Sequence, residues 1–186
     1  MKWNLHFPKS HVSLWADRYI QNNKDQKREN EIELQISPKI REHGFYTKEE
    51  FLAVCEWKSR RPEKFYAKND EDFIQEITRI ALSSRHERLR IEILRVLEGV
   101  DWPTASALLH FGSKDRYPIL DFRALSSLSI SPPPPYTFDF WMEYVETCRH
   151  LADELKVDMR TLDRALWQFS KENDQEKRSD KESKCC

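Results

Sequence analysis

Apolar residues recur every three or four positions along most of this chain, in runs that polar stretches separate. This spacing places apolar side chains on one face of a helix, and no segment has convincing strand character. We therefore predict an all-α protein. The predicted helices cover about residues 10–21, 31–43 with a break at Pro38 and an end at Gly44, 47–57, 70–81, 84–97, 104–111, 121–128, 137–155 and 158–171.

Residues that favour helix starts support several of these boundaries. Thr47 and Glu50 have the spacing of a capping box, and Ser84 and Glu87 repeat that spacing. Asn69 or the residue after it suits the cap of the following helix. These signals give the helix starts more support than apolar spacing alone.

A tight corner is expected near Gly99, between two predicted helices. Gly99 can adopt the left-handed conformation that ends a helix, and Pro103 suits the first position of the next helix. The second helix leaves backbone N–H groups available at its amino end, where a phosphate can bind. An extended stretch, Tyr117–Leu120, then leads to Asp121.

This segment resembles the helix-hairpin-helix DNA glycosylases of the endonuclease III and adenine glycosylase type. The resemblance rests on the pattern Leu97-x-Gly99-Val100-x-x-x-Thr104-Ala105, followed by Asp121 where that family has a catalytic aspartate. It covers residues 97–125 well, and the remainder only through its helical character. It implies two helical lobes, with the hairpin and Asp121 at the mouth of a cleft.

Three differences from the family pattern narrow the expected activity. Pro103 stands where bifunctional members have a lysine, which leaves no obvious Schiff-base nucleophile and implies base removal without strand cleavage. The sequence makes no prediction of whether Lys58 or Lys114 supplies an amine instead. Asp101 replaces a hairpin glycine, and its charge opposes a nearby phosphate. The four cysteines lack the spacing of an iron–sulfur cluster and no Cys/His cluster has zinc spacing, so we expect no cofactor and no metal.

Asp121 is the expected catalytic residue. Cleavage of a bond between sugar and base develops positive charge on the sugar, and a fixed carboxylate stabilises that charge and can orient water. The alternative is an ordinary helix cap, a common role for aspartate. Arg123 can contact a phosphate or hold Asp121 by a salt bridge.

The formal net charge of −1 argues against a nucleic-acid binder, but the charge is unevenly distributed. Residues 58–68, named here the basic segment, mix five cations with aromatic residues and a single acid, which suits contact with a nucleic-acid backbone beside a stacking surface. A solvated loop between two helices is the alternative. The candidate DNA-binding residues are Gly99, Val100, Asp101, Trp102, Thr104, Lys58, Arg60, Arg61 and Arg123.

Tryptophans give weaker indications of a base pocket. Trp57 and Lys58 end a helix that we expect to border the cleft, so they are the candidate pocket residues. Trp102 can act as a wedge or pack inside, whereas core packing is the default for Trp141 and Trp167.

The expected domains are N-terminal helices over residues 1–46, a helix-hairpin-helix lobe over 47–128, C-terminal helices over 129–171 that pack with the N-terminal segment, and a disordered tail over 172–186. No apolar run approaches the length of a membrane span, and no secretory leader is evident. We therefore expect a cytoplasmic, intracellular protein, with nucleoid association left open. The terminal Cys185–Cys186 resembles a doubly prenylated tail, with an unstructured end as the alternative.

Two functions remain in play at this stage. The first is a monofunctional DNA glycosylase that removes a damaged or modified base from double-stranded DNA, in repair or against foreign DNA. The second is a non-catalytic helix-hairpin-helix module that binds DNA or a protein, which the near-neutral charge and Asp101 favour. The sequence makes no prediction of the base or of the oligomeric state.

Overall fold

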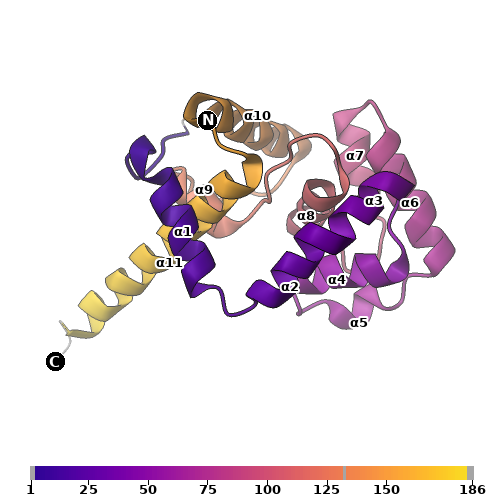
Figure 1. Cartoon of the computed structure of the whole chain (residues 1–186), viewed down its shortest axis with the longest axis horizontal. Coiled ribbons are helices and arrows are strands. Elements are labelled where there is room, and N and C mark those ends of the chain that lie inside the picture. Colours follow the sequence, from indigo (N-terminus) through magenta and orange to yellow (C-terminus); the bar gives the residue numbers. More distant parts are fainter. Residues whose placement is uncertain (1–2, 132, 184–186) are drawn as a thin grey trace. The chain divides into compact units, whose positions relative to one another are not determined.

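The computed structural model describes residues 3–131 and 133–183, and every regular element in these ranges is a helix (Figure 1). This confirms the predicted all-α fold class. The elements are η1 (Lys9–His11), α1 (Val12–Asn22), α2 (Gln26–Glu31), η2 (Ile32–Ile36), α3 (Ser37–His43), α4 (Lys48–Lys58), α5 (Glu63–Tyr66), α6 (Glu71–Ser83), α7 (Glu87–Leu94), α8 (Trp102–Gly112), α9 (Phe122–Ser127), α10 (Phe138–Leu155) and α11 (Met159–Ser183).

Backbone contacts divide the chain into two compact units. Unit 1 comprises Met1–Asn23, Asp121–Pro135 and Thr147–Cys186, and unit 2 comprises Lys24–Leu120 and Tyr136–Glu146. The boundaries differ from the predicted ones, because residues 24–46 group with the hairpin and residues 121–128 with the two chain ends. The dividing point after Glu146 lies inside α10.

Unit 1 is built on α11, which packs against α1 and α9. Phe7, Trp15 and Phe169 form an aromatic cluster between the amino-terminal segment and α11, with ring centroids 4.8–6.2 Å apart. The Ser127 hydroxyl at the end of α9 donates to the backbone carbonyl of Leu166. The N-terminal segment and the last helix therefore share a core, a pairing that the resemblance, and not the sequence pattern, had implied.

Unit 2 surrounds α8, which contacts α3, α4, α6 and α7. Almost every residue of α8 is buried, so an almost wholly apolar sequence forms a central helix instead of an amphipathic surface one. Trp141 is also fully buried and stacks on Tyr117, which confirms its predicted core position.

The helix that contains Pro38 is not broken there. It runs from α2 through the π-helical turn η2 into α3, and Gly44 ends it with a left-handed φ of 77°. Proline lacks an N–H and its ring clashes with the preceding turn of an α-helix, whereas a wider π turn accommodates both. The predicted end at Gly44 is confirmed, and the predicted break is wrong.

Of the two capping boxes that the sequence predicts, one is present and one is not. The capping box of α4 is present, since Thr47 Oγ1 accepts from Glu50 N at 3.3 Å and Glu50 Oε2 accepts from Thr47 N at 2.9 Å. Helix α7 instead begins at Glu87, because Ser84 Oγ accepts from the N–H of His86 and forms a turn before the helix. The predicted capping box at Ser84 is therefore wrong.

Helix α11 continues to Ser183, where the sequence predicts a disordered tail from Glu172. The Glu172 carboxylate pairs with Arg18 of α1, and the residues beyond it are mostly good helix formers. Cys185–Cys186 lies outside the described residues. Within the described part of the chain, no helix has the length and apolar content needed to cross a membrane.

Candidate nucleic-acid interface

Gly99 is the centre of the corner between α7 and α8. Its φ of 82° lies in the left-handed region, as predicted. A Cβ at this position would stand 2.9 Å from the ring of Tyr66 and 3.0 Å from the Cβ of Phe65. Backbone conformation and close packing therefore both require glycine here.

Asn69 fixes this turn from outside it. The side chain is buried; its Nδ2 donates to the carbonyls of Tyr66 and Glu98 at 3.0 and 3.1 Å, and its Oδ1 accepts from Glu98 N at 2.8 Å. One amide thus joins the end of α5 to the corner. The sequence offered Asn69 or Asp70 as the cap of α6, and the N-cap residue is Asp70, without a side-chain cap hydrogen bond.

The turn and the basic segment consequently lie side by side. The Tyr66 hydroxyl is 3.2 Å from Thr104 Oγ1, so α5 is attached directly to α8. Burial raises the pKa of Tyr66 to about 12, although the hydrogen bond to Thr104 lowers it. The sequence presented these as two separate candidate regions, and the structure brings them together within unit 2.

The predicted hairpin residues divide into buried and exposed groups. Val100, Trp102 and Thr104 are 7%, 5% and 4% exposed, so their side chains hold the corner together and do not form a contact surface. Of the two roles left open for Trp102, wedge or packing, its burial favours packing. Contact of these three residues with DNA stays a prediction, and their burial favours contact through the backbone. Asp101 is exposed and lies on the solvent side of the turn.

Asp101 occupies the amino end of α8 with its own carboxylate. Its Oδ1 accepts from Trp102 N at 2.8 Å and lies 3.5 Å from Nε of Arg95, whose guanidinium stands over the Trp102 ring. A carboxylate here satisfies the positive end of the helix, as a bound phosphate does elsewhere. The expected opposition between Asp101 and a phosphate therefore has a clear structural basis.

The candidate pocket residue Trp57 and the cations of the basic segment that follows it differ in exposure. Trp57 is half-buried and meets Phe111 edge to face at 5.2 Å, which makes it partly a packing residue. Lys58 is half-buried at the end of α4, whereas Arg60 and Arg61 are exposed. The exposed cations form the part of this segment that is accessible to a ligand.

Asp121 belongs to unit 1, where it is the N-cap of α9. It is half-buried, and its Oδ1 accepts from Arg123 N at 2.9 Å. The guanidinium of Arg123 lies over the rings of Phe122 and Trp167, at 5.0 and 5.6 Å. The carboxylate is thus held in a defined orientation at a helix start, the placement that the resemblance implies for a catalytic aspartate.

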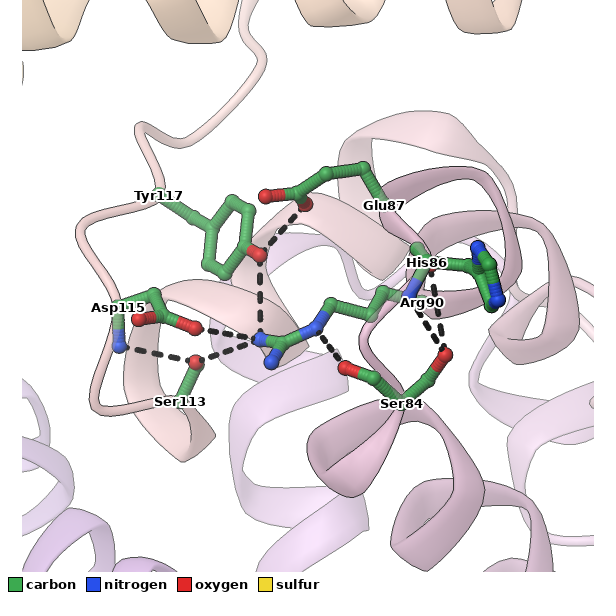
Figure 2. Close-up of polar contacts among 7 residues, drawn as sticks. All are labelled: Ser84, His86, Glu87, Arg90, Ser113, Asp115 and Tyr117. Atoms are coloured by element: carbon green, nitrogen blue, oxygen red, sulfur yellow. Dashed lines mark hydrogen bonds and ion pairs between the residues drawn. The ribbon is translucent and has the colours of Figure 1, made fainter.

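The segment that leads to Asp121 has no regular structure, yet side chains hold it closely. Figure 2 shows Arg90 at the centre of a polar network, with Nη1 donating to Ser113 Oγ at 3.3 Å, Asp115 Oδ2 at 2.7 Å and the Tyr117 hydroxyl at 3.1 Å. The Tyr117 hydroxyl in turn donates to Glu87 at 2.6 Å, and Arg90 Nε donates to the Ser84 carbonyl.

Side-chain hydrogen bonds also hold the last two residues before Asp121, Ile119 and Leu120. Ser106 Oγ accepts from Leu120 N at 2.8 Å, and the Tyr144 hydroxyl donates to the Ile119 carbonyl at 3.0 Å. Sequence reasoning missed this whole set, because each partner is distant along the chain and no local spacing signals it.

Among the described residues, no group of three or more His, Cys, Asp and Glu side chains is arranged to hold a metal ion. Cys55 and Cys148 are buried thiols, and burial raises the pKa of Cys55. Comparison with protein-family models, with curated proteins and with solved structures gives no match for this chain.

Proposed function

We propose that this chain is a helix-hairpin-helix DNA-binding protein that acts as a monofunctional DNA glycosylase, with Asp121 as its catalytic carboxylate. The observation that carries the proposal is the placement of Asp121 at the start of α9, with one oxygen fixed by Arg123 N. Within unit 2, hydrogen bonds of the Tyr117, Ser106 and Tyr144 side chains hold the segment that precedes it.

The proposed reaction is hydrolysis, because the candidate site offers the Asp121 carboxylate but has Pro103 in place of the lysine of bifunctional glycosylases. A target nucleotide rotates out of the duplex, and the bond between its sugar and base breaks as positive charge develops on the sugar. Asp121 stabilises that charge and orients a water molecule, which adds to the sugar and leaves an abasic site. Pro103 in place of a lysine makes hydrolysis the expected outcome, without strand cleavage.

The surface formed by the Gly99 corner and the basic segment is the proposed backbone contact. Arg60 and Arg61 are exposed there, and Asn69 holds the corner in one conformation. Phosphate contacts of this kind position a protein on DNA without specifying sequence.

The test is release of a base from duplexes that each carry one modified base, detected as alkali-labile abasic sites. We expect release from at least one duplex, and Asp121→Asn should abolish it. Asparagine is as good an N-cap as aspartate, so the variant should keep α9 and its melting temperature. Asp158→Asn is the matched control, since it also neutralises a carboxylate that accepts a backbone N–H at a helix start, from Thr161 N at 2.8 Å, and base release should persist in it.

A non-catalytic DNA-binding module is the second candidate, because Asp101 and Asp121 both serve as caps of their own helices. This candidate predicts that no modified base is released while DNA binding survives Asp121→Asn. That pair of results would rule out the glycosylase.

A further inference from the structure

Phe65 is an exposed aromatic ring on a firmly held helix. It is 48% exposed, whereas its neighbour Tyr66 is fully buried and bonded to Thr104. Asn69 fixes the chain just after α5. With Tyr66 anchored inside, α5 cannot turn Phe65 inward, so the ring faces solvent in the folded protein.

One cation stands over this ring, and other exposed cations lie in the same segment of the chain. The Lys68 ammonium stands 4.8 Å from the ring centroid, and Lys48 Nζ donates to the carbonyl of Ala67 at the end of α5. The basic segment contains one acid, Glu63. Its exposed cations are Arg60, Arg61, Lys64 and Lys68.

An exposed ring among cations fits a ligand that is both flat and anionic. Unpaired nucleotides have this chemistry, since each offers a base face for stacking and a phosphate for the cations. Bases inside a duplex have their faces covered by neighbouring bases, so a duplex engages the cations but not the ring. An acidic protein surface would satisfy the cations but offers no comparable set of flat faces.

We propose that the basic segment binds single-stranded DNA, with the Phe65 ring stacked on one unpaired base and Lys68 moving from the ring to a phosphate. This inference rests only on the DNA-binding part of the proposed function and does not require base release.

The experiment measures fluorescence anisotropy of a labelled oligothymidylate with the full chain, over a range of salt concentrations. Stacking contributes about 1–3 kcal/mol per base, so Phe65→Ala should weaken binding by about 5- to 150-fold, and Phe65→Trp should restore it. The salt dependence should stay unchanged in Phe65→Ala and become shallower in Arg61→Ala, because arginine is a cation that displaces counterions from the DNA whereas phenylalanine is uncharged.

Phe73→Ala is the matched control. Phe73 is a 43% exposed phenylalanine on α6 and lies outside the basic segment, so its loss should leave binding unchanged. Equal affinity of Phe65→Ala and the unmodified protein, or an equal loss in Phe73→Ala, would overturn the inference. So would binding to duplex alone, which would leave the ring as a protein-docking residue.

Failure of this inference and failure of the proposed function are distinguishable. Single-strand binding that depends on Phe65, without base release from any duplex, supports the stacking role and removes the glycosylase. Base release that depends on Asp121, together with single-strand binding that is unchanged in Phe65→Ala, supports the glycosylase and removes the stacking role.

Discussion

Two glycines of this chain, Gly44 and Gly99, are required for different structural reasons. Gly99 and Gly44 both have left-handed backbones, with φ of 82° and 77°, but a Cβ at Gly44 meets nothing within 4 Å. A Cβ at Gly99 meets the Tyr66 ring at 2.9 Å. A side chain at Gly44 would therefore cause backbone strain alone, whereas one at Gly99 would also clash with the Tyr66 ring.

Substitution of each glycine by alanine should show this difference in the free energy of unfolding. Gly44→Ala should cost about 1–2 kcal/mol, the cost of a left-handed alanine. Gly99→Ala should add about 1–3 kcal/mol of overpacking to that strain. Urea denaturation of both variants measures the difference, and equal losses would show that the Tyr66 ring moves aside without cost.

At the residue scale, signals whose partners lie within one turn were predictable at Thr47 and Gly99 but not at Ser84, which accepts from the N–H of His86 instead. The capping box at Thr47 and the left-handed Gly99 follow from local spacing and backbone sterics. Asn69 could not be assigned, because the peptide group it binds lies 29 positions away at Glu98. The accommodation of Pro38 by a π turn also escaped prediction, since it depends on a wider turn that composition does not signal.

At the scale of elements, the segment between α8 and α9 shows how irregular backbone can be held in place. The Tyr117 hydroxyl links Arg90 to Glu87, and the residue is buried. Helices on both sides of the segment could be predicted from apolar spacing. The side-chain network could not, because it joins residues 23–30 positions apart.

Tyr117→Phe should loosen this segment. Removal of the hydroxyl leaves Arg90 and Glu87 with one fewer partner, at a cost of about 1–3 kcal/mol in the free energy of unfolding. Amide hydrogen exchange should accelerate in residues 113–120. Tyr46→Phe is the control, since it removes a buried hydroxyl bonded to the Leu108 carbonyl in the same unit, and exchange in 113–120 should not change with it.

At the scale of the whole molecule, three buried acidic groups of unit 2 have raised pKa values. Burial raises the pKa of Tyr46 and of Cys55 well above their usual values, and that of Tyr66 to about 12. The unfolded chain loses these protons at lower pH than the folded protein does, so rising pH favours unfolding. Stability should be constant with respect to these groups at neutral pH and fall from about pH 9 upward.

Urea denaturation at neutral and alkaline pH measures this effect. The midpoint should decrease between about pH 9 and pH 12, the range set by the ordinary thiol pKa and the raised pKa of Tyr66. Tyr66→Phe should make the decrease shallower above about pH 10, because phenylalanine has no proton to lose. An unchanged slope in this variant would mean that Tyr66 does not contribute.

The grouping of distant segments was only partly predictable at this scale. The sharing of one core by the amino terminus and α11 was expected from the resemblance, and contacts between α1 and α11 bear it out. The membership of residues 24–46 in unit 2 was not expected, because Ser37 and Arg41 of α3 reach carbonyls of α8 through hydrogen bonds that no periodicity reveals.

The clamp that Asn69 places on the Gly99 corner has a consequence for recognition. Since the amide satisfies both the N–H and the carbonyl of Glu98, the corner acquires its shape when the protein folds and needs no ligand to complete it. A ligand that binds this corner meets a preorganised surface, so the corner itself loses little conformational entropy on binding. Rapid association with little structural adjustment is the behaviour that such a surface favours.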